Sequence, residues 1–373
     1  MRIGIEAQRL FRPKKHGMDV VALELIKNLQ QIDKKNSYVV FVRKDADDYV
    51  IKESQNLEID KLTSLTYFDW EQVKLKKSLG SKKIDLLHCT ANTAPLSLNI
   101  PFIVTIHDII YLEKIDFKGT AYQNLGNIYR RFIVPRIAKK ADLILTVSNY
   151  ERQNIIERLG LPEKRVQVLY NGVSEIFNTN YSEHELNAFR KKYNVPKNYI
   201  MFLGNTAPKK NTANVIRAYV EYCLVEKDGV PMVLLDYKKE LVVKLLQELR
   251  AQTLIDKFIF PGYVPHNQIP LMYNAASLFL YPSLRESFGL PILEAMACGT
   301  PVITSNTSSM PEIAGDAAKQ INPFNCSEIA QAILGLMQSK SCQESYSEKG
   351  LEHVKNFTWK ASAEKLLSIY NSF

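Results

Sequence analysis

Residues 278–294 read LFLYPSLRESFGLPILE, and this stretch indicates the fold class. It starts with a short apolar run, continues through a polar loop and enters a helical pattern with Pro291 in its first turn. Proline is favoured there because the first N–H groups of a helix have no partner within the helix. A buried strand that leads through a loop into a helix is typical of a βαβ unit, so we predict a parallel sheet covered by helices.

The same alternation of apolar runs and helical patterns fills the rest of the chain. The N-terminal runs are Arg2–Ala7, Tyr38–Val42, Ile84–His88, Phe102–Ile106, Leu143–Val147 and Val166–Leu169. After a polar segment, the runs resume at Tyr199–Leu203, Met232–Leu235, Phe258–Phe260, Leu278–Tyr281 and Pro301–Thr304. Two such series predict an α/β chain with two Rossmann-like, doubly wound domains over residues 1–172 and 173–357. We expect the polar segment 173–196 to act as a hinge.

Two helices can be placed from the spacing of their apolar residues. The first contains Met18, Ala22, Leu25, Ile26 and Leu29, which recur at the intervals of one helix face. The second covers about residues 358–373. We expect the first helix to be a crossover on the N-terminal sheet, and the second to follow the C-terminal sheet or to pack on the N-terminal domain.

The composition is that of a soluble globular protein, with 46% hydrophobic and 23% charged residues in 373. No apolar run approaches the roughly 20 residues that span a bilayer, and no signal-peptide pattern is present. We therefore expect the protein in the cytoplasm, with the inner face of the cell membrane as an alternative. Its five cysteines form no C-x-x-C pair, so the usual signature of zinc or redox chemistry is missing.

The positive charge is concentrated in the first half of the chain. Residues 1–172 contain 28 Lys and Arg against 20 Asp and Glu, which accounts for most of the net charge of +9. Residues 74–83 and 130–140 mix basic with apolar residues, a composition typical of helices that contact an anionic membrane surface. A solvated basic face is the alternative. We expect no nucleic acid partner.

Two glutamates flank the helix start within residues 278–294. Glu286 lies in the loop, and we expect Glu294 in the first helical turn. A helix start binds anions such as a diphosphate, and Gly289 would let a ligand approach the backbone closely. Carboxylates accept hydrogen bonds from neighbouring sugar hydroxyls. Without further context, the plainer interpretation is a solvated loop residue and a carboxylate that complements the helix dipole.

Residues 285–305, RESFGLPILEAMACGTPVITS, are similar to the E-x7-E signature of the retaining family 4 glycosyltransferases. Further segments resemble that family's landmarks in the same order, so the resemblance covers almost the whole chain. These segments are Val104–Asp108, Thr146–Ser148, Tyr170–Val173 and Gly204–Asn211. The resemblance implies the GT-B fold, in which two Rossmann-like domains face a central cleft. It assigns the acceptor to 1–172 and the nucleotide-sugar donor to 173–357.

The resemblance also implies roles for individual residues. The catalytic candidates are Glu286 and His107, both near the transferred sugar, and Lys210 at the donor phosphates. The donor-binding candidates are Glu294 at the ribose, Lys209, Asn205, Ser287, Phe288, Gly289, Leu290 and Gly17. The acceptor-side candidates are Asp108, His88 and Ser148. Asn205 stands where many relatives have an arginine. Gly17 is the single glycine of its loop, whereas relatives often have two or more glycines there. By pattern alone, the two lysines also fit an exposed basic loop and His107 a structural histidine.

No motif indicates a metal or another cofactor. The chain lacks a G-x-G-x-x-G after a strand, a Walker phosphate loop and an H-E-x-x-H pair. Asp45-Ala-Asp47 has the D-x-D spacing that holds Mg²⁺ or Mn²⁺ in the other large glycosyltransferase fold, but it lies in a charged turn without a third ligand nearby. We expect no metal, and a nucleotide sugar as substrate.

The sequence therefore predicts a retaining, metal-independent hexosyltransferase. The resemblance slightly favours mannose from GDP-mannose, with UDP-glucose or UDP-N-acetylglucosamine as alternatives, and a glycan or lipid-linked acceptor in cell-surface polysaccharide or lipopolysaccharide synthesis. A non-catalytic nucleotide-sugar-binding subunit and a GT-B-type epimerase or hydrolase are the competing interpretations.

Overall fold

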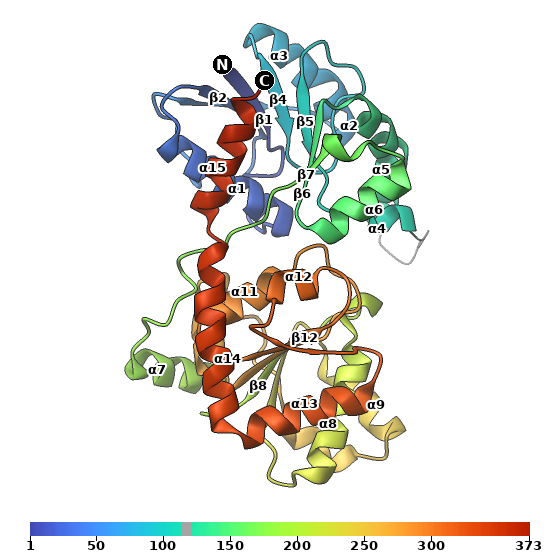
Figure 1. Ribbon diagram of the computed structural model, residues 1–373, viewed down its shortest axis with the longest axis vertical. Helices are drawn as coiled ribbons and strands as arrows, with labels where there is room; N and C mark the ends of the chain where they lie inside the picture. Colours follow the sequence, from blue (N-terminus) through green and yellow to red (C-terminus); the bar gives the residue numbers. More distant parts are fainter. Residues whose placement is uncertain (114–120) are drawn as a thin grey trace. The chain divides into compact units, whose positions relative to one another are not determined.

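The computed structural model describes residues 1–113 and 121–373, which form two compact units. Unit 1 combines Met1–Gly172 with Trp359–Phe373, and unit 2 is Val173–Thr358. Each unit contains one parallel β-sheet with helices on both faces (Figure 1). The predicted α/β class with two Rossmann-like domains is confirmed.

The sheet of unit 1 has seven strands in the order β3-β2-β1-β4-β5-β6-β7. They are β1 (Arg2–Glu6), β2 (Ser37–Arg43), β3 (Leu57–Leu62), β4 (Leu86–Cys89), β5 (Phe102–Thr105), β6 (Leu143–Thr146) and β7 (Val166–Val168). The sequence predicted every strand except β3. This edge strand is only half covered, so it carries Glu58 and Asp60 among its apolar residues and does not form an apolar run.

Alternate residues of this sheet pack on opposite helical layers. Val40 and Val42 face α1 (Gly17–Ile32) and α15 (Trp359–Tyr370), which lie side by side (Figure 1). Val39 and Phe41 face the other layer. That layer and its margins comprise α2 (Tyr67–Asp69), the π-helix η1 (Trp70–Leu75), α3 (Lys76–Ser81), α4 (Ile110–Glu113), α5 (Ala121–Lys140), α6 (Asn149–Leu159) and η2 (Glu163–Arg165). The C-terminal helix therefore belongs to unit 1.

The sheet of unit 2 has six strands in the order β10-β9-β8-β11-β12-β13. They are β8 (Ile200–Leu203), β9 (Met232–Leu235), β10 (Phe258–Ile259), β11 (Leu278–Tyr281), β12 (Val302–Ser305) and β13 (Lys319–Ile321). The sequence missed β13, an edge strand in which only Ile321 is buried.

Helices cover both faces of the second sheet as well. One face packs on α8 (Thr212–Val225), α9 (Lys239–Glu248) and α13 (Cys326–Gln338). The other helices are α7 (Glu183–Tyr193), α10 (Ile269–Ala275), α11 (Leu290–Ala297), α12 (Met310–Ala314) and α14 (Lys340–His353). Short turns of helix are η3 (Pro208–Lys210), η4 (Gln252–Lys257), η5 (His266–Gln268) and η6 (Val354–Asn356).

The predicted hinge over 173–196 is wrong for most of its length. Ser182 caps α7 in a capping box with Glu185, and the helix buries Phe189 and packs on α10. A helix with a capped end and a buried face belongs to the body of a domain. The chain passes between the units only at 172–173 and 358–359. Within the described residues, no helix is long and apolar enough to cross a membrane.

Candidate functional site

Each sheet has one point where the strand order reverses, between β1 and β4 in unit 1 and between β8 and β11 in unit 2. In open parallel sheets, ligands bind beyond the carboxyl ends of the strands at this switch point, because the loops there diverge to opposite faces. The predicted site residues are therefore expected at the two switch points.

At the switch point of unit 2, the loops that follow β8 and β11 are joined by an ion pair. The Nζ of Lys210 lies 2.7 Å from Oε1 of Glu286 and donates a hydrogen bond to the Tyr281 hydroxyl at 3.0 Å. The Nζ of Lys209 lies 3.7 Å from Oε2 of Glu286 and is more exposed. The structure thus brings together three of the predicted residues.

Hydrogen bonds hold the loop with Lys209 and Lys210 against the loop with Glu286. Asn211 adopts a left-handed conformation with φ 60°. Its side-chain Nδ2 donates to the carbonyls of Pro282 at 3.1 Å and Pro323 at 2.6 Å. The N–H of Leu284 donates to the carbonyl of Lys209 at 2.7 Å. Because Asn211 is buried and tolerates a left-handed backbone, it holds both loops in one arrangement.

Glu286 is held from the opposite side by the loop after β12. The Ser308 and Ser309 hydroxyls donate to its carbonyl at 2.6 and 2.9 Å, and its own N–H donates to Ser308 Oγ at 3.1 Å. Burial alone would raise the pKa of its carboxyl, but the charges of Lys210 and Lys209 outweigh that effect and hold the pKa below its ordinary value. Glu286 is therefore an ionised carboxylate in a buried position.

The helix that follows begins at Leu290, one residue after a left-handed glycine. Gly289 has φ 104° and is buried, and Ser287 and Leu290 on either side of it are half-buried. The Phe288 ring is buried and its carbonyl accepts from Ser309 Oγ at 3.0 Å. Helix α11 begins directly after the loop that carries Glu286, and its first N–H groups have no partner within the helix.

Glu294 lies in the second turn of α11, so its predicted position in the first turn is wrong. The left-handed Gly289 starts the helix at Leu290, which makes Glu294 its fifth residue. The half-buried side chain accepts a long hydrogen bond from the Tyr273 hydroxyl at 3.4 Å. Loss of hydration raises the pKa of the carboxyl to about 7, and the Tyr273 bond opposes this only in part.

Asn205 contributes no charge to this cluster. It is exposed, and its Oδ1 accepts from the N–H of Ala207 at 2.8 Å, which shapes the turn before Lys209 and Lys210. The two lysines pair with the Glu286 carboxylate, and Arg285 of the same loop donates to the Glu286 carbonyl at 3.0 Å.

At the switch point of unit 1, His107 is held by the loop after β4. Its Nε2 donates to the carbonyl of Thr90 at 2.9 Å, and its backbone N–H donates to Oδ1 of Asn92 at 2.7 Å. Burial lowers the pKa of the ring despite the Thr90 carbonyl, so the neutral form predominates. With the proton on Nε2, the lone pair of the ring is on Nδ1.

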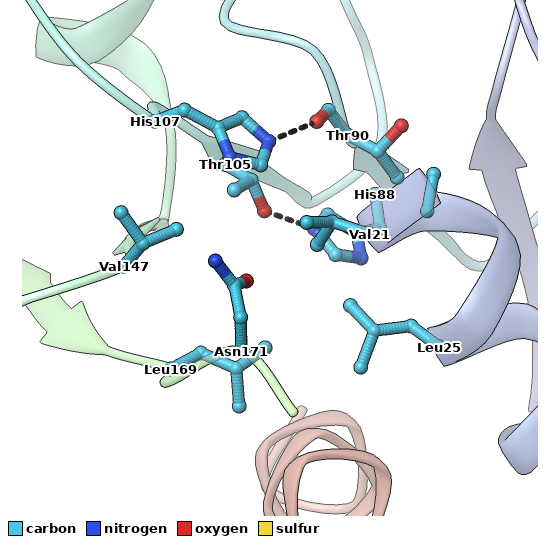
Figure 2. Close-up of a pocket in the computed structure, with 10 residues that line it drawn as sticks. Val21, Leu25, His88, Thr90, Thr105, His107, Val147, Leu169 and Asn171 are labelled. Atoms are coloured by element: carbon cyan, nitrogen blue, oxygen red, sulfur yellow. Dashed lines mark hydrogen bonds between the residues drawn. The ribbon is translucent and has the colours of Figure 1, made fainter. Parts of the chain in front are cut away.

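His107 lines a small cavity in unit 1, together with residues of α1, β4 and β5 (Figure 2). The cavity measures about 10 Å³, close to the minimum for one water molecule. Figure 2 shows the side chain of Asn171 pointing into the same space from the chain beyond β7. The lining is apolar apart from a few hydroxyl, amide and imidazole groups.

His88 lines the same cavity, but both of its ring nitrogens have partners within unit 1. Nδ1 lies 2.6 Å from the Tyr370 hydroxyl of α15, and Nε2 lies 2.7 Å from Oγ1 of Thr105. Burial lowers its pKa to about 3. These bonds give His88 a structural role between the C-terminal helix and the sheet.

The remaining predicted residues of unit 1 act on local structure. Asp108 accepts from the N–H of Ile110 at 3.1 Å, and Ser148 caps α6 by accepting from the N–H of Glu151. Gly17 is the exposed first residue of α1, and a side chain there would meet nothing within 4 Å. Asp47 of the D-x-D string forms an ion pair with Lys15. Among the described residues, no group of three or more His, Cys, Asp and Glu side chains converges as metal ligands would.

Sequence reasoning missed the residues that hold the candidates in place: Tyr281, Asn211, Ser308 and Ser309 in unit 2, and Thr90 and Asn92 in unit 1. A usable signal exists for the serines, because the run Ser305–Ser309 follows a predicted strand directly. Nothing in the sequence pairs Lys210 with Glu286, because 76 positions separate them.

Two family models match consecutive parts of the chain. The model described as Glycosyltransferase Family 4 matches residues 16–175, and the model described as Glycosyl transferases group 1 matches residues 184–353. HepE of Anabaena, solved in complex with UDP, superposes over the full length of both chains with a TM-score of 0.75 at 18% identity. The chain belongs to the family 4, group 1 glycosyltransferases, and its two units have the GT-B architecture.

Two curated relatives come from Escherichia coli. O-antigen chain mannosyltransferase B is 33% identical over 230 residues, which are 62% of this chain and 60% of that protein. The serotype-specific mannosyltransferase WbdA is 29% identical over 274 residues, which are 71% of this chain and 33% of that protein. The chain therefore matches less than two thirds of the length of these relatives.

Proposed function

We propose that the protein is a retaining, metal-independent hexosyltransferase that moves mannose from GDP-mannose to a glycan or lipid-linked acceptor in the synthesis of an O-antigen or a related surface polysaccharide. The observation that carries the proposal is the ion pair between the half-buried Lys210 and the buried Glu286 at the switch point of unit 2. It combines a cation for a leaving diphosphate with a carboxylate for sugar hydroxyls in one place.

The donor is assigned to unit 2. Lys210, with Lys209 beside it, would neutralise the diphosphate, and the backbone around 287–290 would donate hydrogen bonds at the start of α11. When the phosphates attract Lys210, Glu286 is freed to accept hydrogen bonds from the transferred sugar. Glu294, with its pKa raised to about 7, would accept from the ribose hydroxyls in its ionised form.

The transfer step needs no nucleophile from the protein. The bond between the anomeric carbon and the phosphate oxygen breaks, and the acceptor oxygen bonds to the same face of that carbon. The departing phosphate oxygen takes the proton of the acceptor hydroxyl. Lys210 stabilises the charge on that phosphate, and the neutral ring of His107 offers Nδ1 as a hydrogen-bond acceptor for a hydroxyl of the sugar.

The preference for mannose is supported by the names of the relatives. O-antigen chain mannosyltransferase B and WbdA are both named for mannosyl transfer. The cytoplasm, where nucleotide sugars are made, is the proposed location. The charge of the two lysines takes the place that a divalent metal occupies in other donor sites, which supports metal independence.

The test is transfer from GDP-mannose, UDP-glucose and UDP-N-acetylglucosamine to a mannose-terminated oligosaccharide, each with EDTA or with Mg²⁺. Product anomers are assigned by NMR. The proposal predicts transfer from GDP-mannose in EDTA with the α configuration of the donor retained. An inverted product, a requirement for metal, or release of free sugar without transfer would contradict it.

A further inference from the structure

Helix α5 exposes a row of large apolar side chains. Leu125, Ile128 and Phe132 are 66%, 51% and 50% exposed. Their spacings of three and four residues place them on one side of the helix. The opposite side is buried in the core of unit 1 through Ile133 and Ile137, so the exposed row cannot turn inward without breaking that packing.

Helix α2 lies beside α5 in the same unit (Figure 1). Phe68, 56% exposed, packs edge-on against Tyr129 of α5 with the ring centroids 6.1 Å apart. Phe68, Leu125, Ile128 and Phe132 together are called the apolar face below. Singly exposed apolar residues are normal on a protein surface, but a contiguous group marks a surface that meets something else.

The charges that α5 places beside the apolar face all have one sign, whereas α2 carries one carboxylate, Asp69. Helix α5 contains five basic residues, Arg130, Arg131, Arg136, Lys139 and Lys140, and no acidic residue. Arg136 and Lys139 follow Phe132 at intervals of four and three residues and are exposed, so they extend the same side of the helix. The guanidinium of Arg136 lies 3.7 Å from the centroid of the Phe132 ring, which keeps a cation at the edge of the apolar face.

This arrangement distinguishes the apolar face from the exposed apolar pair at the end of α8. Leu224 and Val225 of unit 2 are 71% and 69% exposed, but they end α8 between two glutamates, Glu221 and Glu226. An apolar row bordered by arginine and lysine fits a partner that is both anionic and apolar. A bilayer with anionic headgroups has both properties, because headgroups attract the cations while apolar side chains enter the boundary with the acyl chains.

We propose that the apolar face docks unit 1 on an anionic lipid bilayer, with α5 lying along the surface. Ile128 and Phe132 enter the lipid boundary, and Arg136, Lys139 and Lys140 contact the headgroups. The docking surface is separate from the residues assigned to transfer, so vesicle binding and sugar transfer can succeed or fail independently.

The test is sedimentation of the protein with vesicles of phosphatidylcholine alone and of phosphatidylcholine mixed with phosphatidylglycerol. The chain should bind only the mixed vesicles, and added salt should weaken the binding. The Ile128→Ser/Phe132→Ser variant should bind at least about tenfold more weakly, because two large apolar side chains are no longer transferred from water into the lipid. The matched control is Leu224→Ser/Val225→Ser, which removes an even more exposed apolar pair from unit 2 and should bind as the wild type does.

A second pair of variants separates charge from apolar contact. Arg136→Gln/Lys139→Gln should weaken binding to mixed vesicles while leaving the apolar row intact. Equal binding to both kinds of vesicle, no binding to either, or an equal loss in the unit 2 control would overturn the proposal. So would a dimer in sedimentation equilibrium that the Ile128→Ser/Phe132→Ser variant dissociates, because the face would then join two copies of the chain. If that double variant fails to fold, as judged by circular dichroism, Ile128→Ser alone takes its place.

Discussion

The switch points of the two sheets occupy the same place in the strand order, yet the candidate residues at them differ in charge. In unit 2, the switch point holds two lysines around an ionised Glu286. In unit 1, it holds a neutral His107 fixed by a carbonyl and an amide. Two ammonium groups suit a diphosphate, and a neutral imidazole suits hydroxyl groups. The difference shows how one fold, used twice in a chain, can be adapted to two kinds of ligand by a few loop residues.

Removing the central cation of unit 2 should have the largest effect. Lys210→Ala should lower kcat by about 100- to 1000-fold, because it removes the half-buried charge that we propose stabilises the leaving phosphate. It should also move the pH profile upward, since without this cation the pKa of Glu286 rises and the carboxylate forms only at higher pH. Initial rates of sugar transfer over a range of pH measure both effects.

Lys209→Ala is the matched control for this variant. It removes the same charge, but the Lys209 side chain is 41% exposed and its ammonium is farther from Glu286. Solvent screens it, so the loss should be about tenfold or less. Equal losses in the two variants would mean that the Lys210–Glu286 geometry has no special role.

The two buried histidines of unit 1 should separate function from structure. His107→Asn should lower kcat by about 10- to 100-fold, equivalent to roughly 1.4–2.8 kcal/mol, with donor affinity unchanged. His88→Asn should instead lower the free energy of unfolding by about 1–3 kcal/mol, because Thr105 and Tyr370 lose their buried partner. Kinetics and urea unfolding of both variants test this. A stability loss for His107→Asn without a rate effect would make it a structural histidine as well.

The contrast extends to two buried glutamates. Glu6, at the end of β1, has one carboxylate oxygen bonded to the N–H of Gln8 and the other buried without a partner among the described residues. Burial raises its pKa from 4.5 to about 7. The native state therefore holds more protons than the unfolded state between these values, and stability falls as the pH rises through them.

Glu6→Gln should remove this dependence. Relative to wild type, the variant should gain up to about 3 kcal/mol between about pH 5 and pH 8. Glu286→Gln should show the opposite sign, because the pKa of Glu286 is lowered and its stabilising effect is lost as the pH falls. Urea unfolding decides the question, between about pH 5 and pH 8 for Glu6→Gln and below pH 4.5, the ordinary glutamate value, for Glu286→Gln. The same sign for both variants would contradict the assigned environments.

The smallest expected effect is at the start of α11. Gly289→Ala should lower the free energy of unfolding by about 1–2 kcal/mol, because φ 104° disfavours a residue with a side chain. The added Cβ would also lie 3.2 Å from Cδ1 of Ile292. Thermal unfolding measures the loss. Gly17→Ala, at an open position with ordinary φ, is the control and should change stability little.

Local pattern was sufficient for the fold class but not for every element. Strands buried on both faces form apolar runs, so all but the edge strands β3 and β13 were predicted. The position of Glu294 was misjudged because the left-handed Gly289 starts the helix already at Leu290, and sequence spacing does not reveal backbone conformation. The pairing of Lys210 with Glu286 joins residues far apart in the chain, which only the strand order brings together. The catalytic and binding roles of these residues remain predictions.

The most direct test of the central claim, a metal-independent diphosphate site built on Lys210, is thermal unfolding in EDTA with GDP-mannose, with UDP-glucose and with NAD. Donor at about 100 times its dissociation constant adds about 2.7 kcal/mol, which should raise the midpoint of unit 2 by roughly 5–10 °C. The account predicts this shift with a sugar nucleotide but not with NAD, and its loss in Lys210→Ala. No shift with any sugar nucleotide, a shift that needs metal, or an undiminished shift in Lys210→Ala would contradict it.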